Sequence, residues 1–170
     1  MVKPNVVLTG FMGTGKSAVG RLLAKRLGAD FVDTDDLIVA RDGRSIADIF
    51  RESGQRAFRQ WEALISQELA GQTGLVIATG GRLMLDEANA AVLSHNAHVF
   101  CLTAVPETIL ARLIDDAGQR PLLNVPDPAQ AVIDLLEQRR EGYGRFPQIL
   151  TDNKTPEQIV EEIIQCISAT

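Results

Sequence analysis

Short apolar runs alternate with amphipathic stretches along most of the chain. Five runs rich in β-branched residues have the length and composition of buried strands: NVVLTG (5–10), DFVDTD (30–35), LVIATG (75–80), HVFCLT (98–103) and PQILTD (147–152). A stretch with helical periodicity follows each run, so helices separate successive strands. This alternation favours right-handed crossovers and a parallel sheet covered on both faces. We therefore expect an α/β fold, a three-layer sandwich with roughly five parallel strands.

One segment interrupts this alternation. Residues 115–130, DDAGQRPLLNVPDPAQ, place three prolines, a glycine and several acids between two helical patterns. A polar stretch marked by prolines is either a plain surface connection or a mobile lid. No internal repeat or second apolar core accompanies it, so we expect residues 1–170 to form a single domain.

The composition and net charge of the chain limit the kinds of partner and the cellular compartment that we expect. The 170-residue chain has a formal net charge of −5 and lacks the basic excess that a nucleic-acid partner requires. No apolar stretch approaches transmembrane length, and the first apolar run leads into a glycine-rich loop, unlike a signal peptide. Cys101 and Cys166 lack metal-ligand spacing, and we expect both to be buried packing residues of a reducing compartment. We expect a cytoplasmic protein without a membrane partner, and a monomer, although the sequence itself does not fix the oligomeric state.

The loop GFMGTGKS, from Gly10 to Ser17, follows the first predicted strand and opens the first predicted helix. Its spacing is the complete P-loop pattern, in which glycines let successive backbone N–H groups point at phosphate oxygens. Lys16 supplies a positive charge for the β- and γ-phosphates and is a candidate catalytic residue, while the Ser17 hydroxyl can bind Mg²⁺. The residues expected to bind the nucleotide are Gly13, Thr14, Gly15, Lys16, Ser17 and Ala18. The loop alone leaves open ATP hydrolysis, a GTP switch and phosphorylation of an acceptor.

Two carboxylates mark the end of the second predicted strand. Asp33 and Asp35 alternate along FVDTD, so an extended chain turns both to the same side. Because ligands bind beyond the carboxyl ends of parallel strands, we expect this pair beside the P-loop. One acid can hold a water of the Mg²⁺ shell, and the other can orient an acceptor hydroxyl and take its proton. Alternatively, Asp35 or Asp36 caps the following helix.

Further motifs occur along the rest of the chain. In order they are DTD (33–35), GRSIADIF (43–50), AFRQWE (57–62), ATGG (78–81), RPLL (120–123) and the pair Arg139 and Tyr143. With the P-loop, this set resembles the shikimate kinase family over nearly the whole chain, and GRSIADIF with FRxxE is more discriminating than the P-loop. The resemblance implies a P-loop fold of the nucleoside-monophosphate-kinase type. It also implies Mg²⁺-dependent transfer of the γ-phosphoryl group of ATP to the 3-hydroxyl of shikimate, a step of aromatic amino acid biosynthesis.

The resemblance also implies an acceptor site. Arg59 and Arg139 match the two arginines that bind the shikimate carboxylate, and a planar guanidinium suits bidentate carboxylate binding. Gly80 and Gly81 match the family's glycine turn, where the backbone approaches the substrate because no side chain intervenes. Glu62 follows Arg59 by three residues on a helical pattern and can orient it through an ion pair.

Other matches concern the transferring phosphoryl group. Asp35 matches the acid that contacts the acceptor hydroxyls, and Asp33 matches the acid beside the metal that Ser17 helps to bind. Arg120 matches a lid arginine that reaches the ATP phosphates, which makes residues 115–130 the lid that excludes water. Lys154 lies in a stretch that resembles the loop against adenine and is a further candidate for nucleotide binding.

The chain departs from the family pattern in two places. The glycine turn usually reads GGG, whereas Arg82 occupies its third position here. Arg82 can add a third cation near an anionic acceptor, point outward, or restrict the turn if that position needs a positive φ. We expect it to point away from the acceptor or to form a local salt bridge, because two arginines suffice for one carboxylate. Glu141 and Gly142 occupy a turn that commonly contains proline, so the turn that follows Arg139 is less rigid in this chain.

Two other functions are compatible with these residues. A related kinase for another hydroxylated or sugar acid is one, and the Arg82 departure keeps it open. A nucleotide-binding regulatory module without catalysis is the other. A scaffold has no need of Lys16, Asp35 and both acceptor arginines, so their presence favours an enzyme.

Overall fold

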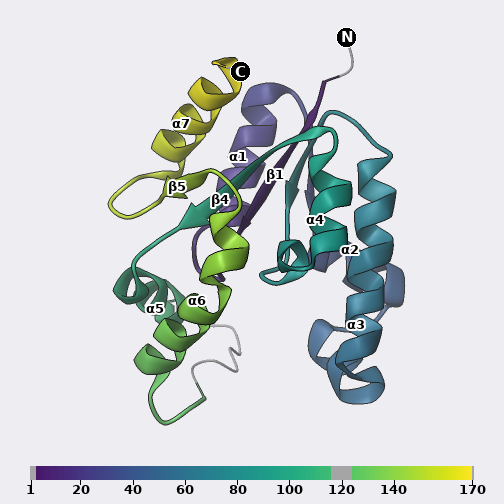
Figure 1. Cartoon of the computed structure of the whole chain (residues 1–170), viewed down its shortest axis with the longest axis vertical. Coiled ribbons are helices and arrows are strands. Elements are labelled where there is room, and N and C mark those ends of the chain that lie inside the picture. The colour runs from purple at the N-terminus through teal and green to yellow at the C-terminus, as the bar shows by residue number, and fades with distance from the viewer. Residues whose placement is uncertain (1–2, 116–123, 170) are drawn as a thin grey trace.

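The structure is a computed structural model that describes residues 3–115 and 124–169 (Figure 1). Its strands are β1 (Asn5–Gly10), β2 (Asp30–Asp33), β3 (Leu75–Ala78), β4 (Ala97–Thr103) and β5 (Gln148–Leu150). Its helices are α1 (Lys16–Leu27), α2 (Thr34–Asp42), α3 (Ile46–Ala70), the 3₁₀ turn η1 (Leu83–Leu85), α4 (Glu87–Ser94), α5 (Pro106–Asp115), α6 (Pro128–Gly144) and α7 (Pro156–Ser168). The five strands form a single parallel sheet in the order β2-β3-β1-β4-β5, which confirms the predicted α/β sheet.

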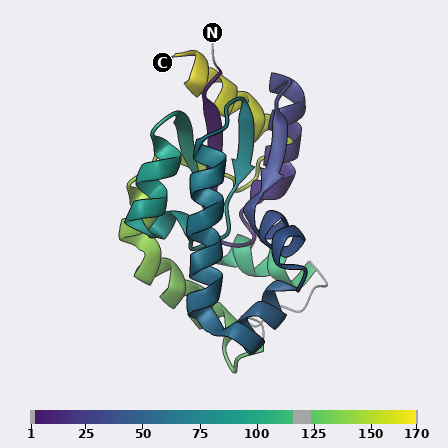
Figure 2. The ribbon, with the colours of Figure 1, turned by 90° about the vertical axis from the view of Figure 1, so that its right-hand side faces the viewer.

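Both faces of the sheet are covered because the central strand β1 is apolar on both sides. Val6 and Leu8 pack with the apolar faces of α1 and α7, whereas Val7 packs with α2, α3 and α4. Figure 1 shows α1 and α7 on one side of the sheet and α2, α3 and α4 on the other, and in Figure 2 the long helix α3 runs in front of the strands. Strands buried on both faces are typical of parallel α/β sheets, so the predicted three-layer sandwich is confirmed.

A third apolar cluster anchors the P-loop to the sheet. Phe11 of the loop is buried against Cys101 of β4, Ile109 of α5, and Val132 and Tyr143 of α6. The loop therefore rests on β4, α5 and α6 as well as on its own helix α1. This packing fixes the nucleotide loop relative to the segment that carries Arg139.

Local signals in the sequence explain where several elements start and stop. Thr155 and Gln158 form a reciprocal capping box at the start of α7. Gly28 adopts the left-handed conformation that ends α1, with φ 61° and ψ 44°. The second strand is shorter than the apolar run suggested, because β2 ends at Asp33 and Thr34 already belongs to α2.

Some predictions need correction or lie beyond what the structure describes. The segment predicted as a lid, residues 115–130, overlaps two helices, since Asp115 ends α5 and Pro128 begins α6. Arg120 lies outside the described residues. Cys101 is buried as expected, whereas Cys166 is exposed, because it lies on the outer side of α7. Among the described residues, no helix is both long enough and apolar enough to cross a membrane.

Candidate active site

The P-loop joins β1 to α1 at the carboxyl edge of the sheet. Gly10 has a φ of +132°, and a Cβ at this position would meet the Leu102 carbonyl oxygen of β4 at 2.3 Å. Glycine is therefore required both by the backbone conformation and by the close approach of β4. Lys16 donates from Nζ to the carbonyl oxygens of Gly10 and Phe11, at 2.8 and 2.9 Å. Its ammonium group is thereby held over the loop where the motif predicts phosphates.

The residues predicted to bind the nucleotide differ in what they do in the loop. Thr14 is buried and donates from Oγ1 to the Phe11 carbonyl oxygen at 2.8 Å, so its side chain stabilises the loop. Gly13 and Gly15 have φ values of +77° and +92°, the conformations that wrap the loop. Ser17 and Ala18 are exposed in the first turn of α1, at the positive end of the helix dipole.

Ser17 and Asp33 place two side-chain oxygen atoms next to each other, of the kind that bind hard cations such as Mg²⁺. The Ser17 hydroxyl donates to Asp33 Oδ2 at 2.8 Å, across the start of α1 and the end of β2. Hydroxyl and carboxylate oxygens suit Mg²⁺, so these residues fit the predicted metal. Within the described chain, no group of three or more His, Cys, Asp or Glu side chains can hold a metal ion. A magnesium ion here therefore needs further ligands from phosphates and water.

Asp33 also caps α2. Its Oδ1 accepts hydrogen bonds from the backbone N–H groups of Asp35 and Asp36, at 3.0 and 3.4 Å. The helix cap is therefore Asp33 and neither Asp35 nor Asp36, which corrects that alternative. Because Asp33 accepts the hydrogen bonds of the N–H groups in the first turn of α2, the Asp35 carboxylate is available for other contacts.

Asp35 lies in the first turn of α2, against the Gly80–Gly81 turn that follows β3. Its Oδ1 is buried and accepts no hydrogen bond from any described residue. A Cβ on Gly80 would lie 2.6 Å from this oxygen, so glycine leaves the room that the carboxylate occupies. Burial, followed by the neighbouring Asp33 charge, raises the pKa of Asp35 from 3.8 to about 6, while Lys16 acts in the opposite direction.

Arg59 and Glu62 form an ion pair on α3. Glu62 is 2% exposed, and its Oε2 accepts a hydrogen bond from Arg59 Nη1. Burial raises the pKa of Glu62, and the bond from Arg59 opposes that rise. Arg59 is half-buried over the Phe58 ring, and its positive charge reaches Asp35, whose pKa it lowers slightly. The predicted orienting contact between Arg59 and Glu62 is therefore present.

Arg139 lies on α6 beside the same glycine turn. Its guanidinium is 5.2 Å from the centre of the Phe11 ring, and Nη1 is 3.5 Å from the Tyr143 hydroxyl. Tyr143 donates in turn to the Gly81 carbonyl oxygen at 2.5 Å. Burial raises the pKa of Tyr143, so the hydroxyl keeps the proton that it donates. A Cβ on Gly81 would be 3.5 Å from Arg139 Nη1, an ordinary contact.

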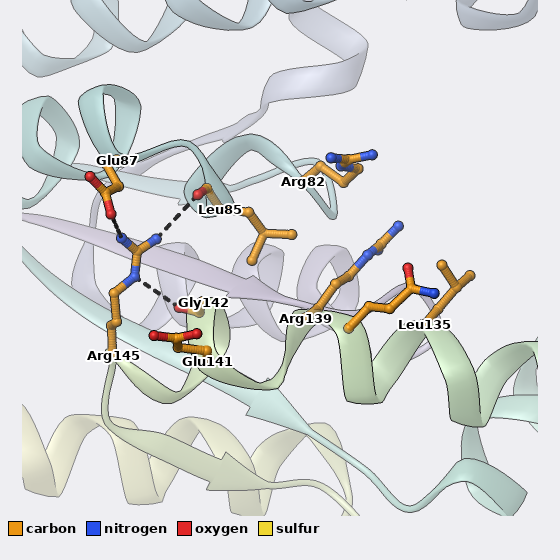
Figure 3. Close-up of a pocket in the computed structure, with 9 residues that line it drawn as sticks. Arg82, Leu85, Glu87, Leu135, Arg139, Glu141, Gly142 and Arg145 are labelled. Carbon is orange, nitrogen blue, oxygen red and sulfur yellow. Dashed lines mark hydrogen bonds and ion pairs between the residues drawn. The ribbon is translucent and has the colours of Figure 1, made fainter.

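A cavity of about 430 Å³ opens between η1 and α6. Figure 3 shows Glu87, Glu141 and Arg145 at one end, and Arg82 and Arg139 at the other. Arg145 is held by the Met84 carbonyl oxygen at 2.9 Å and lies 3.9 Å from Glu87. Arg82 has φ −110°, so the positive φ considered for the third turn position is not needed and an arginine causes no strain.

A further cation contacts the nucleotide loop. Arg112 of α5 donates to the Gly13 carbonyl oxygen at 3.1 Å and to Thr151 Oγ1 at 3.0 Å, and so connects the P-loop to the segment after β5. Sequence reasoning missed this residue, because nothing in the helical pattern distinguishes it from a solvated arginine. Lys154, the other lysine predicted to bind the nucleotide, lies in the loop before α7 and pairs with Glu162 of that helix at 2.5 Å.

The fold and the site together define the class of the protein. A P-loop follows β1, carboxylates follow β2 and arginines lie near them, which is the arrangement of a P-loop kinase with a phosphoryl-transfer site. The comparison with known families gives the particular group. The family model described as shikimate kinase matches residues 12–168. The chain belongs to the shikimate kinase family.

Individual relatives agree with this membership. A shikimate kinase of Thermus thermophilus is 43% identical over 161 residues, which cover 94% of this chain and 88% of the relative. The shikimate kinase of Geobacter sulfurreducens is 45% identical over 160 residues, with the same coverage of 94% and 88%. The solved shikimate kinase from Acinetobacter baumannii in complex with shikimate has a TM-score of 0.90 and 36% identity, covering 98% of this chain and 94% of that one.

Proposed function

We propose that this protein transfers the γ-phosphoryl group of Mg·ATP to the 3-hydroxyl of shikimate, giving shikimate 3-phosphate and ADP. The observation that carries the proposal is the position of the Asp35 carboxylate against the Gly80 turn, close enough to Lys16 and Arg59 for both charges to act on it. One carboxylate is thus within electrostatic reach of both the phosphate loop and Arg59, the proposed acceptor-binding cation. Membership of the shikimate kinase family supports the choice of acceptor.

The acceptor carboxylate binds to the guanidinium groups of Arg59 and Arg139. Both are presented by fixed contacts, Arg59 through Glu62 and Arg139 between the Phe11 ring and the Tyr143 hydroxyl. Such preorganisation lowers the conformational entropy lost on binding and aims the acceptor hydroxyl at Asp35. The Gly80–Gly81 turn forms the floor between the two ends of the acceptor.

Asp35 takes the proton of the attacking hydroxyl. A bond forms between the acceptor oxygen and the γ-phosphorus, the bond from that phosphorus to the β,γ-bridging oxygen breaks, and ADP leaves. A pKa of about 6 keeps the carboxylate largely ionised at neutral pH, yet basic enough to accept a proton. Lys16 stabilises the charge on the transferring group, because its ammonium lies over the loop.

Ser17 and Asp33 are the residues that would hold Mg²⁺ with the nucleotide. When bound, the ion neutralises charge on the β- and γ-phosphates. The two residues also have a positioning role. Ser17 donates a hydrogen bond to Asp33, and Asp33 fixes the first turn of α2 and hence the place of Asp35.

Acceptor-dependent release of ADP tests the proposal. With Mg²⁺ and ATP, we expect ADP release to be slow and to accelerate strongly on addition of shikimate. Gluconate, a sugar acid, serves as the comparison acceptor. Turnover with gluconate but not with shikimate would assign the protein to a related kinase. ATP binding without turnover in either case would indicate a binding module.

Replacing Glu62 with glutamine tests how Arg59 is held. We expect the KM for shikimate to rise about 5- to 10-fold, with little change in kcat, because the loss of a charge-assisted bond frees Arg59 without touching the reacting atoms. Steady-state kinetics measures both constants. Glu68→Gln is the control, because Glu68 lies on the same helix as Glu62 but pairs with Arg41 of α2 at the surface, and it leaves both constants unchanged. An unaltered KM in Glu62→Gln would contradict the orienting role.

A further inference from the structure

Arg82 projects from a rigid base beside the acceptor site. Its carbonyl oxygen accepts a hydrogen bond from Leu85 N–H at 3.0 Å, and the next two residues, Leu83 and Met84, are fully buried. The preceding glycine, Gly81, is held by Tyr143. The Cα of Arg82 is therefore fixed on both sides, and only its exposed side chain is adjustable.

The two ends of the cavity of about 430 Å³ differ in how their charged residues are paired. At one end, Arg145 is engaged by backbone carbonyl oxygens and lies near Glu87, with Glu141 beside it (Figure 3). At the other end, Arg139 rises from α6 towards the loop that carries Arg82. Among residues 3–115 and 124–169, no carboxylate forms an ion pair with Arg82 or Arg139. Two guanidinium groups that line one end of a cavity favour an anion between them.

The charge of Arg82 also acts on Glu62 and Tyr143, the residues that contact the two acceptor arginines. Burial raises the pKa of Glu62 and of Tyr143, and the positive charge of Arg82 is among the weaker influences that oppose the rise in each. Glu62 holds Arg59, and Tyr143 contacts Arg139. Arg82 is thus within electrostatic reach of both sides of the proposed acceptor site.

The order of contacts along the turn assigns Arg82 to one end of the acceptor. Gly80 abuts Asp35, and Gly81 abuts Arg139, so the chain moves away from the reacting end as it proceeds to Arg82. We infer that Arg82 is a third acceptor-binding cation, which binds the carboxylate end of the acceptor together with Arg139. It selects anionic acceptors over neutral ones. This inference rests on the proposed function and replaces the expectation that Arg82 points away from the acceptor.

Kinetics of Arg82→Gln test the inference. We expect the KM for shikimate to rise about 3- to 20-fold, with kcat within about twofold of wild type, because the residue lies away from the transferring group. Arg82→Lys keeps the charge but not the planar fork, so its KM falls between the two. In the wild type, the KM rises more steeply with ionic strength than in Arg82→Gln, since one fewer charge pair is screened in the variant.

Two comparisons separate an electrostatic contact from a structural effect. With the uncharged methyl ester of shikimate as acceptor, wild type and Arg82→Gln have the same KM. Arg140→Gln is the matched control, because Arg140 carries the same charge but pairs with Glu137 on the exposed side of α6. It leaves the KM for shikimate unchanged.

The outcomes distinguish this inference from the proposed function. Turnover of shikimate by wild type, with an unchanged KM in Arg82→Gln, would overturn the role of Arg82 alone. An equal rise in KM for shikimate and for its methyl ester would also overturn it, because a general disturbance of the turn would then explain the effect. If wild type shows no shikimate-dependent turnover, the proposed function fails and the inference fails with it.

Discussion

Asp35→Asn is expected to lower kcat by about 10²- to 10⁴-fold, the range typical for loss of a general base. The amide has nearly the same shape as the carboxylate but cannot take the hydroxyl proton. The KM for shikimate changes less than kcat, because Arg59 and Arg139 still bind the carboxylate end. Single-turnover phosphoryl transfer, measured with saturating ATP and shikimate, isolates this step from product release.

The same substitution is expected to stabilise the nucleotide-free protein at neutral pH. The pKa of Asp35 is raised from 3.8 to about 6, so the folded state binds the proton more tightly than the unfolded state does. The stability that this proton contributes is fully present below pH 3.8 and is lost as the pH rises through about 6. Above that pH, the ionised carboxylate costs roughly 1–3 kcal/mol, which asparagine avoids.

Urea unfolding in EDTA across the pH range tests this linkage. The free-energy difference between Asp35→Asn and wild type should be near zero at pH 4 and should grow to its plateau by pH 7. Asp36→Asn is the control, because Asp36 is exposed and lies 3.8 Å from Arg21 at the surface. Retention of kcat in Asp35→Asn would remove Asp35 from the mechanism. A stability difference that does not depend on pH would contradict the raised pKa.

Gly80→Ala is expected to lower kcat by about 10²-fold, because a displacement of roughly 1 Å at a reacting group has that effect. The added methyl group would lie 2.6 Å from Asp35 Oδ1 and 3.3 Å from its Cγ, so the carboxylate must move. The Gly80 N–H donates to Thr34 Oγ1 at 2.9 Å, which prevents the turn from retreating instead. The carboxylate therefore leaves its place beside the acceptor hydroxyl.

Gly81→Ala provides the matched comparison within the same turn. Its methyl group would be 3.5 Å from Arg139 Nη1 and 3.8 Å from the Tyr143 hydroxyl, both ordinary contacts. We expect its kcat to stay within about threefold of wild type and its KM for shikimate to rise modestly, since it adjoins the binding end of the acceptor. Steady-state kinetics of both variants, with circular dichroism to confirm folding, gives the comparison. Equal losses of kcat in the two variants would rule out a specific contact between Gly80 and Asp35.

The P-loop and the order of strands and helices were predictable because both depend on local rules. Glycine spacing, helix periodicity and cap residues such as Thr155 act within a few residues, and the structure contains the elements that they predict. The pairing of Arg59 with Glu62 was equally predictable, since both lie on one helical face three residues apart. The place of Asp33 beside the P-loop, where it accepts a hydrogen bond from Ser17, was expected from the rule that ligands bind at the carboxyl edge of a parallel sheet.

Finer features depended on residues that are distant in the chain. An extended strand end suggested that the side chains of Asp33 and Asp35 point to the same side of the chain. In the structure, the early start of α2 makes Asp33 the helix cap and buries Asp35 against Gly80, which gives the two acids different environments.

By itself, the sequence determined the phosphate loop, the order of the elements and the set of charged residues available to a site, because these follow from local backbone rules and periodicity. Only the tertiary structure decided how those charges act. Burial beside Gly80 sets the pKa of Asp35, and packing of η1 against α6 brings Arg82 to the cavity that Arg139 lines. Side-chain desolvation and charge proximity depend on neighbours from other strands and helices, and those neighbours are fixed only when the sheet assembles.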